Sequence, residues 1–282
     1  MIQKVGIVGS GTMGNGIAQV FAQHGFEVRL VDVSMPALER AKGVIDKSLG
    51  KFVEKGTISA ADRDATLSRL QFLGSIDHLA AADFIVEAIV EQREAKRTLF
   101  AKLDALAGPD VVLATNTSSI SITDIAAATQ RPGLVLGMHF MNPVPLMPLV
   151  ELIRGQSTSD AAMATAEDLC RRLGKTGIPA SDYPGFIANR ILMPMINEAV
   201  FALMEGVGTA EAIDSVMKLG MNHPMGPLTL ADFIGLDVCV AILDVMHEGF
   251  GDPKYRACPL LRRMVAAGHL GRKSGQGFYH YA

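Results

Sequence analysis

Residues 137–152, GMHFMNPVPLMPLVEL, carry one histidine and one carboxylate in a stretch that is otherwise almost entirely apolar. His139 and Glu151 are separated by three prolines, so the segment favours extended or turned backbone over helix. A chain that doubles back here would bring the carboxylate beside the ring. That carboxylate would fix the tautomer and leave the other ring nitrogen as a proton acceptor. Such a pair suits the removal of a hydroxyl proton while hydride leaves the same carbon.

A structural explanation is also open for both residues. His139 would then be a partly buried histidine bonded to a backbone carbonyl, and Glu151 would form a salt bridge at the rim. The two explanations differ in one respect, because only the catalytic one requires the ring and the carboxylate to lie side by side.

A glycine-rich loop, GSGTMG, places Gly9, Gly11 and Gly14 in the G-x-G-x-x-G pattern. The first glycine permits a tight turn, the second lets the backbone approach a pyrophosphate, and the third packs a helix against a strand. Together with Thr12 and Met13, this helix start would offer N–H groups and a positive dipole end to phosphates. The loop predicts a dinucleotide cofactor.

Asp32 ends the β-rich run EVRLVD, about 20 residues after the loop, where dinucleotide-binding folds place an acid for the ribose. Its carboxylate would bond a ribose diol and repel a 2′-phosphate, and residues 33–36 contain no arginine. The sequence therefore predicts NAD, with NADP disfavoured. A glycine-rich turn and a surface aspartate form the structural alternative.

The elements that must position these residues alternate in type along the first part of the chain. Short β-rich or apolar runs occur at residues 5–8, 27–32, 83–90, 111–115, 134–140 and 149–153. Most are separated by helical lengths, as parallel crossovers require, and their continuous apolar character indicates burial on both faces. We therefore predict an α/β fold, with a doubly wound Rossmann-type domain over residues 1–183.

The later part of the chain has a helical pattern. Helical periodicity or helix caps are found at residues 184–206, 209–220, 227–247 and about 259–267. The only later segment with the character of a strand is FYHY, near the end. We expect an all-helical C-terminal domain over residues 184–282.

Composition and charge exclude several classes of protein. Apolar residues make up 49% of the chain and charged residues 20%, which favours a buried core over disorder. The net charge of −3 gives no electrostatic basis for a nucleic-acid partner. Cys170, Cys239 and Cys258 have neither disulfide nor metal-ligand spacing, so we expect no metal site and a reducing compartment. Because we find no leader and no membrane span, we expect a cytoplasmic protein without a membrane partner.

Five segments occur in an order that resembles the L-3-hydroxyacyl-CoA dehydrogenase family, and within it the bacterial 3-hydroxybutyryl-CoA dehydrogenases. They are GIVGSGTMGNGIA, ATNTSSISI, HFMNPVPLMPLVELI, PGFIANR and GRKSGQGFYHY. The resemblance runs from the first residues to the last. It implies an NAD-dependent enzyme that interconverts (S)-3-hydroxyacyl-CoA and 3-ketoacyl-CoA of short chain length. It also implies a homodimer formed through the helical domain.

The resemblance assigns roles to four residues of the reaction. It implies that His139 is the catalytic base and that Glu151 is its partner. Ser118 and Asn189 match the family residues that hydrogen-bond the reacting oxygen, where charge develops as hydride moves. The structural alternatives are a turn or cap role for Ser118 and a solvent-exposed place near a helix start for Asn189.

The resemblance also implies cofactor and substrate contacts. Several residues correspond to family positions near the nicotinamide ribose: Glu91, Lys96, Asn116, Ser118, Asn142 and Lys273. Glu91 and Lys96 would equally suit an exposed helix start. Lys47, Lys51 and Lys55 recur every four residues on one helix face, which is usually solvated surface. In the family this segment meets the coenzyme A nucleotide, so Lys51 and Lys55 are predicted to contact phosphate of an acyl-CoA substrate.

Three other functions remain open. The chain could be a related dehydrogenase of a non-CoA 3-hydroxy acid or sugar acid, a crystallin-like structural protein, or an NAD-sensing binding module. The lysine row argues against the first. The retention of His139, Glu151, Ser118 and Asn189 argues against the second. The third lacks a recognisable segment for partner recognition.

Overall fold

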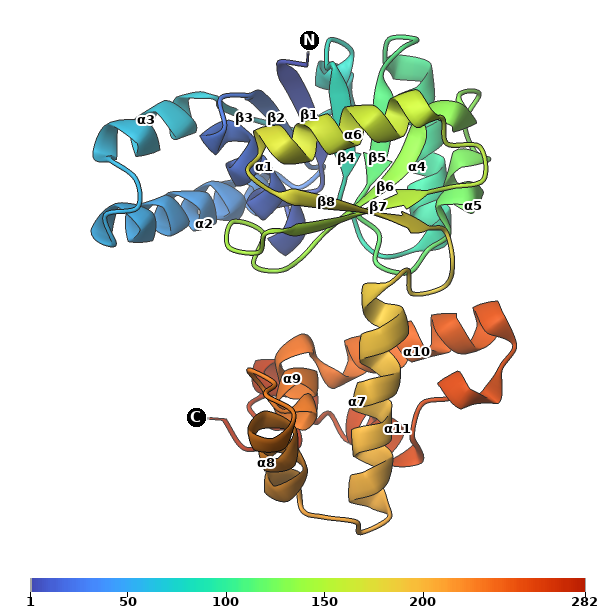
Figure 1. The fold of residues 1–282 in the computed structure, drawn as a ribbon. Helices are drawn as coiled ribbons and strands as arrows, with labels where there is room; N and C mark the ends of the chain where they lie inside the picture. Colours follow the sequence, from blue (N-terminus) through green and yellow to red (C-terminus); the bar gives the residue numbers. More distant parts are fainter. Residues whose placement is uncertain (1, 282) are drawn as a thin grey trace. The chain divides into compact units, whose positions relative to one another are not determined.

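The computed structural model describes residues 2–281 of the chain. The chain forms two compact units, Met1–Asp182 and Tyr183–Ala282 (Figure 1). Within residues 2–281, no helix has both the length and the apolar character needed to cross a membrane. The same part of the chain contains no group of three or more His, Cys, Asp or Glu side chains placed to hold a metal ion.

The first unit is built on an eight-stranded sheet in the order β3-β2-β1-β4-β5-β6-β7-β8. Every neighbouring pair is parallel except β6 and β7, which are antiparallel. The strands are β1 (Lys4–Val8), β2 (Glu27–Val31), β3 (Leu70–Leu73), β4 (Phe84–Glu87), β5 (Val112–Thr115), β6 (Val135–Phe140), β7 (Leu149–Arg154) and β8 (Thr176–Ser181).

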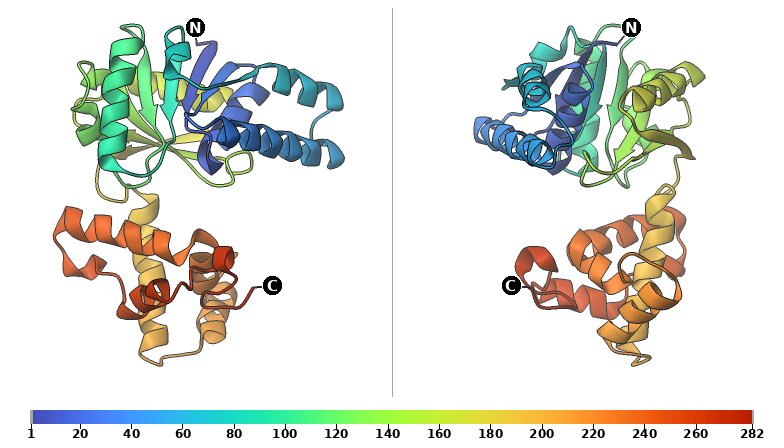
Figure 2. Two further views of the ribbon diagram at one scale, coloured as in Figure 1. Left: turned by 180° about the vertical axis from the view of Figure 1, so that it is seen from behind. Right: turned by 60° about the vertical axis from the view of Figure 1, so that its left-hand side comes forward.

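Helices cover both faces of this sheet (Figures 1 and 2). They are α1 (Thr12–Gln23), α2 (Met35–Glu54), α3 (Ala60–Ser68), α4 (Arg93–Leu106), α5 (Ile122–Ala126) and α6 (Asp160–Arg172). The predicted α/β class and Rossmann-type arrangement are therefore confirmed. The central strands β1, β4, β5 and β6 are almost wholly buried, as their continuous apolar runs predicted.

Local sequence explains how α2 begins and which side it buries. The Ser34 hydroxyl accepts a hydrogen bond from the backbone N–H of Ala37, and Pro36 lies in the first turn. The buried side chains recur at intervals of three or four residues, at Leu38, Ala41, Ile45 and Leu49. This spacing lays one apolar stripe against the sheet.

Two strands were not among the predicted apolar runs. β3 has only four residues, and it pairs with β2 at one edge of the sheet. β8 forms the opposite edge, contains Pro179, and exposes most of its residues. A strand at a sheet edge is half solvated and tolerates proline, so neither segment shows the continuous apolar pattern of a central strand.

The second unit is helical, as predicted, and contains α7 (Ala188–Met204), α8 (Ala210–Gly220), α9 (Pro227–Ile234), α10 (Leu236–Phe250) and α11 (Pro259–Ala266). Its core includes Met193, Ile196, Leu228, Leu243 and Leu261.

Three segments of this unit differ from the predictions. Residues 184–187 form turns, not helix, because Gly185 and Phe186 adopt positive φ values of 81° and 50°. The stretch 227–247 is not one helix, because Gly235 with φ of 104° separates α9 from α10. The predicted strand FYHY was wrong, since these residues form bends with one isolated bridge between Gln276 and His280.

Candidate active site

The glycine loop joins β1 to α1 and has room for a phosphate group. A Cβ atom on Gly9, whose φ is 101°, would lie 2.5 Å from the Ala88 carbonyl oxygen. A Cβ atom on Gly14 would lie 1.8 Å from the Gly9 carbonyl oxygen, so both positions require glycine. A Cβ atom on Gly11 would meet nothing within 4 Å, so the backbone there borders open space. Gly11 also precedes α1 without a capping side chain, which leaves the helix start suited to an anion.

The predicted cofactor residues Thr12 and Met13 are the first residues of α1. Asp32 follows β2 directly and faces the same loop. The backbone N–H and the hydroxyl of Ser10 each donate to Asp32 Oδ2 at 2.8 Å, and the Ser34 N–H donates to Oδ1 at 2.9 Å. Burial raises the pKa of Asp32, but these hydrogen bonds outweigh it and hold the pKa below its usual value. The residue therefore presents an ionised acceptor beside the phosphate loop, as a ribose diol requires.

His139 and Glu151 lie directly opposite each other on the antiparallel strands β6 and β7. His139 Nδ1 is 2.8 Å from Glu151 Oε2, and both residues are buried. An ionised carboxylate only accepts hydrogen bonds, so Nδ1 carries the proton in this contact. The structure thus brings together the two residues that the sequence singled out, while their catalytic roles stay predictions.

The proline-rich segment between these strands is held by a buried lysine. Lys175 Nζ donates to the carbonyl oxygens of Val144 and Met147, each at 2.7 Å. Burial lowers the pKa of Lys175. Because prolines lack N–H groups and cannot form a regular ladder, this lysine supplies hydrogen bonds that fix the connection from β6 to β7.

Ser118 lies in the loop after β5, and Glu91 holds this loop. Glu91 Oε1 accepts from the Thr117 hydroxyl at 2.6 Å, from the Ser118 N–H at 2.7 Å and from the Ser118 hydroxyl at 3.1 Å. Lys96 Nζ lies 3.2 Å from Glu91 Oε2. Burial raises the pKa of Glu91, but Lys96 and these hydrogen bonds bring it below its usual value. The loop that carries Ser118 is therefore anchored to an ionised carboxylate.

Glu87 is a site residue that the sequence reasoning missed. It is the last residue of β4 and is fully buried, with Oε1 accepting from Lys96 Nζ at 2.6 Å. The Thr115 hydroxyl donates to its Oε2 at 2.7 Å. The available signal was an acid in the final position of the apolar run DFIVE, since buried carboxylates are rare without a partner. Lys96 is correspondingly 1% exposed, not a surface residue of a helix start.

The remaining predicted residues occupy different parts of the chain. Asn116 Oδ1 accepts from the Phe140 N–H at 2.9 Å, which links the ends of β5 and β6. Asn142 is exposed in the loop after β6. In the second unit, Asn189 is buried in the first turn of α7. Lys273 Nζ donates to Asp237 Oδ2 at 2.7 Å in the same unit.

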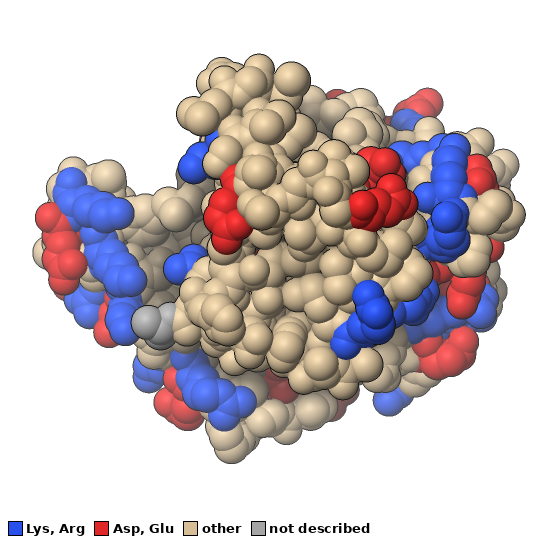
Figure 3. Space-filling view, turned by 90° about the horizontal axis from the view of Figure 1, so that it is seen from below, with Lys and Arg blue, Asp and Glu red and all other residues tan. Residues whose placement is uncertain are grey.

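Lys51 and Lys55 lie at the end of α2, in its last turn and at its C-cap, and both are exposed. Lys and Arg atoms lie among Asp and Glu atoms on the arm formed by α2 and α3, at the left of Figure 3. This arrangement is compatible with solvated surface and with phosphate binding.

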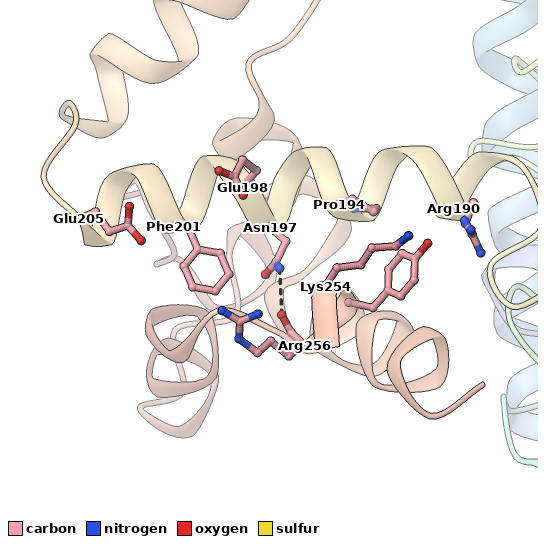
Figure 4. A pocket seen from close by; sticks show the side chains of 9 residues that line it. Arg190, Pro194, Asn197, Glu198, Phe201, Glu205, Lys254 and Arg256 are labelled. Carbon is pink, nitrogen blue, oxygen red and sulfur yellow. Dashed lines mark hydrogen bonds between the residues drawn. The ribbon is translucent and has the colours of Figure 1, made fainter. Parts of the chain in front are cut away.

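A cavity of about 640 Å³ lies beside α7 in the second unit (Figure 4). It is lined by Arg190, Pro194, Asn197, Glu198, Phe201, Glu205, Lys254, Tyr255 and Arg256. None of the predicted catalytic or cofactor residues lines this cavity, so its size alone does not make it the reaction site.

A doubly wound sheet with a glycine loop after β1 and an acid after β2 defines a dinucleotide-binding protein of the Rossmann class. Residues 4–183 match the family model of the 3-hydroxyacyl-CoA dehydrogenase NAD binding domain. Residues 185–281 match the model of the 3-hydroxyacyl-CoA dehydrogenase C-terminal domain. The chain belongs to the 3-hydroxyacyl-CoA dehydrogenase family, so the predicted family, oxidoreductase class and NAD cofactor are confirmed.

Individual relatives are similar over the whole chain. A probable 3-hydroxybutyryl-CoA dehydrogenase from Deinococcus radiodurans is 56% identical over 99% of this chain and 100% of its own length. A probable 3-hydroxybutyryl-CoA dehydrogenase from Bacillus subtilis is 50% identical over 99% of this chain and 98% of its own. The crystal structure of (S)-3-hydroxybutyryl-CoA dehydrogenase PaaH1 from Ralstonia eutropha has a TM-score of 0.97 and 49% identity, and covers 100% of both chains.

Proposed function

We propose that this enzyme interconverts (S)-3-hydroxybutyryl-CoA and acetoacetyl-CoA, with His139 as the general base and Glu151 as its positioning partner. The observation that carries the base assignment is the 2.8 Å contact between His139 Nδ1 and Glu151 Oε2. The substrate assignment is supported by the relatives of about 50% identity that bear that name.

In this proposal, bound NAD supplies the hydride acceptor, and the chain handles the proton. His139 Nδ1 is committed to Glu151, so Nε2 takes the proton from the C3 hydroxyl during oxidation. The imidazolium that forms is stabilised by the carboxylate of Glu151. During reduction, the same nitrogen returns the proton to the developing alkoxide.

Ser118 supplies a hydrogen bond to the reacting oxygen. In this structure the hydroxyl donates to Glu91 Oε1 at 3.1 Å. During the reaction it would turn from Glu91 toward the substrate oxygen, while the backbone N–H of Ser118, at 2.7 Å from Glu91 Oε1, keeps the loop in place. Removal of one preorganised donor of this kind costs about 10²–10³ in turnover. Asn189 is the second proposed donor on the basis of the family resemblance, and Asn189→Ala tests it in the same assay.

The test of the reaction is an absorbance assay at about 340 nm with acetoacetyl-CoA and NADH. We expect turnover with NADH, slower turnover with NADPH, and almost none with free acetoacetate. Comparable rates with acetoacetate and its CoA ester would overturn the acyl-CoA assignment. Separate binding measurements with Asp32→Ala test the cofactor argument, because this change should weaken NAD binding much more than NADP binding.

We place the coenzyme A phosphates at Lys51 and Lys55, because these two exposed residues are four positions apart at the C-terminal end of α2, a spacing that puts side chains on one helix face. The double variant Lys51→Ala, Lys55→Ala should raise the KM for acetoacetyl-CoA about tenfold and leave the KM for NADH unchanged. Lys42→Ala, on another face of α2, is the matched control. An unchanged KM for acetoacetyl-CoA in the double variant would move the phosphates elsewhere.

We propose that the second unit pairs with a second copy of itself through α8 and the residues directly before and after it. Four large apolar side chains are strongly exposed within this short segment: Val207, Val216, Leu219 and Met221. Leu219→Asp should lower the sedimenting mass at micromolar concentration, whereas Val44→Asp on α2 should not. An unchanged mass for Leu219→Asp would exclude this face.

A further inference from the structure

Three charged side chains meet at the carboxyl ends of β4 and β5, and they form what we call the Glu87–Lys96–Glu91 cluster. Lys96 Nζ lies 2.6 Å from Glu87 Oε1 and 3.2 Å from Glu91 Oε2. Glu87 and Lys96 are 0% and 1% exposed, while the Glu91 side chain is 37% exposed. One ammonium group thus serves two carboxylates in a largely buried place.

The hydrogen bonds around the cluster indicate that both carboxylates are ionised. Glu87 Oε1 also accepts from the Ile89 N–H at 2.6 Å, and its Oε2 accepts from the Thr115 hydroxyl at 2.7 Å. The Thr115 hydroxyl oxygen in turn accepts from the Thr117 N–H, so its own proton is directed to Glu87. Glu91 likewise accepts hydrogen bonds, from the Thr117 hydroxyl and the Ser118 N–H. Two negative charges and one positive charge leave the cluster with a net charge of about −1.

The cluster lies in the second half of the Rossmann sheet. Asp32 and the glycine loop belong to the half formed by β1, β2 and β3, which takes the adenosine end of a dinucleotide. Strands β4, β5 and β6 form the other half, and the dinucleotide crosses between the halves at the carboxyl ends of the strands. Glu87 and Thr115 are the last residues of β4 and β5. The net negative charge is therefore on the nicotinamide side.

We propose that the Glu87–Lys96–Glu91 cluster biases binding toward the oxidised cofactor. The charge of Glu87 sets the ratio of the affinities for NAD+ and NADH. The oxidised nicotinamide ring is a cation and the reduced ring is neutral, so a fixed negative charge stabilises only the former. A unit charge in a partly buried site changes such a preference by about three- to tenfold. The inference rests on NAD binding by this family and not on the identity of the acyl substrate.

The experiment measures the dissociation constants of NAD+ and NADH separately, by calorimetry, on the full-length enzyme without acyl substrate. Glu87→Gln keeps the shape of the side chain and removes its charge. We expect the ratio of the NAD+ constant to the NADH constant to rise about three- to tenfold in this variant. Equal weakening of both constants would indicate that Glu87 only supports the fold, and would overturn the proposal.

Two further variants separate charge from shape. Glu87→Gln combined with Lys96→Met returns the cluster to about −1, so its ratio should lie within about twofold of wild type. Glu94→Gln, which removes an exposed charge in the first turn of α4, should leave the ratio unchanged. A tenfold change of ratio in the charge-balanced double variant would overturn the proposal even if Glu87→Gln alone did not fold. A chain that fails to reduce acetoacetyl-CoA could still show the shift, so the two proposals fail independently.

Discussion

Both units of this molecule bury carboxylates, but they surround them differently. In the first unit, Glu87 and Glu151 lie against an ammonium group and an imidazole at the ends of strands. In the second unit, Asp214 and Asp232 are equally buried, yet they accept only from backbone N–H and hydroxyl groups. A basic partner can exchange a proton or balance a charge, whereas a neutral donor can only fix a position.

The carboxylates of the second unit join segments that are distant in sequence. Asp214, on α8, accepts from the N–H groups of Leu228 and Thr229 at the start of α9. Asp232, on α9, accepts from the N–H groups of Phe278 and Tyr279 near the chain end. These bonds connect α8, α9 and the segment around Phe278, and the position of the Asp232 carboxylate explains why residue 277 of the motif GRKSGQGFYHY is a glycine. A Cβ atom on Gly277 would lie 1.9 Å from Asp232 Oδ1.

The two environments place different demands on the carboxylates. A buried carboxylate without donors costs several kcal/mol, so all four acids must be satisfied for the fold to form. Only those beside a basic group are also placed to take part in chemistry. Substitutions that leave shape intact and remove charge should therefore separate the two units.

The largest effect is expected from His139→Ala. Loss of a general base lowers turnover by at least about 10²-fold, while NAD affinity stays near wild type because the glycine loop and Asp32 are untouched. Steady-state kinetics with acetoacetyl-CoA and titration with NAD provide the two measurements. Near-normal turnover would place the base elsewhere. The carboxylates of the first unit would then not differ in function from those of the second.

Glu151→Gln should have the next largest effect. The amide cannot stabilise the imidazolium and can hold the ring in the wrong tautomer, so we expect turnover to fall about 10- to 100-fold. The thermal unfolding of the variant is measured alongside turnover. If Glu151→Gln lowered turnover no more than Asp232→Asn, a buried carboxylate-to-amide change in the second unit, the role of Glu151 would be structural.

Asp232→Asn is that change in the second unit. The amide N–H₂ group would face donors that need an acceptor, so the free energy of unfolding should fall by about 2–3 kcal/mol. Turnover per folded molecule should stay within about twofold of wild type. Asp244→Asn, which removes an exposed partner of Arg262, is the control and should cost less than about 1 kcal/mol. Denaturant titrations measure both, and a loss of turnover without a loss of stability would contradict the comparison.

The smallest effect concerns Tyr281, whose hydroxyl donates to Asp232 Oδ2 at 3.0 Å. Burial, and then this hydrogen bond, raise the pKa of Tyr281 from 10 to about 12. The folded state therefore favours the protonated phenol, so its contribution is complete below about pH 10 and is lost as pH rises through 12.

Tyr281→Phe should consequently be less stable than wild type by about 1 kcal/mol at pH 8. The difference between the two proteins should narrow between pH 10 and 12, as measured by urea titration at each pH. A constant difference across that range would show that the hydroxyl contributes through packing alone.

Much of the fold was predictable because its signals are local. Continuous apolar runs identified the central strands, and helical periodicity and helix caps identified the helices at residues 209–220 and about 259–267. The edge strands β3 and β8 were missed, since their pairing depends on neighbours more than on their own residues. The break at Gly235 was missed because a glycine inside a helical pattern does not reveal the sign of its φ angle.

The sequence by itself determined the cofactor loop, the acid after β2 and the presence of a histidine and a glutamate in apolar surroundings, because each depends on residue type and short spacing. Only the tertiary structure decided that His139 and Glu151 are register partners, since antiparallel pairing of β6 with β7 is a contact between strands. It also decided that Glu87 and Lys96 are buried together. Burial of an ion pair depends on what packs over it, and that packing comes from segments far apart in the chain.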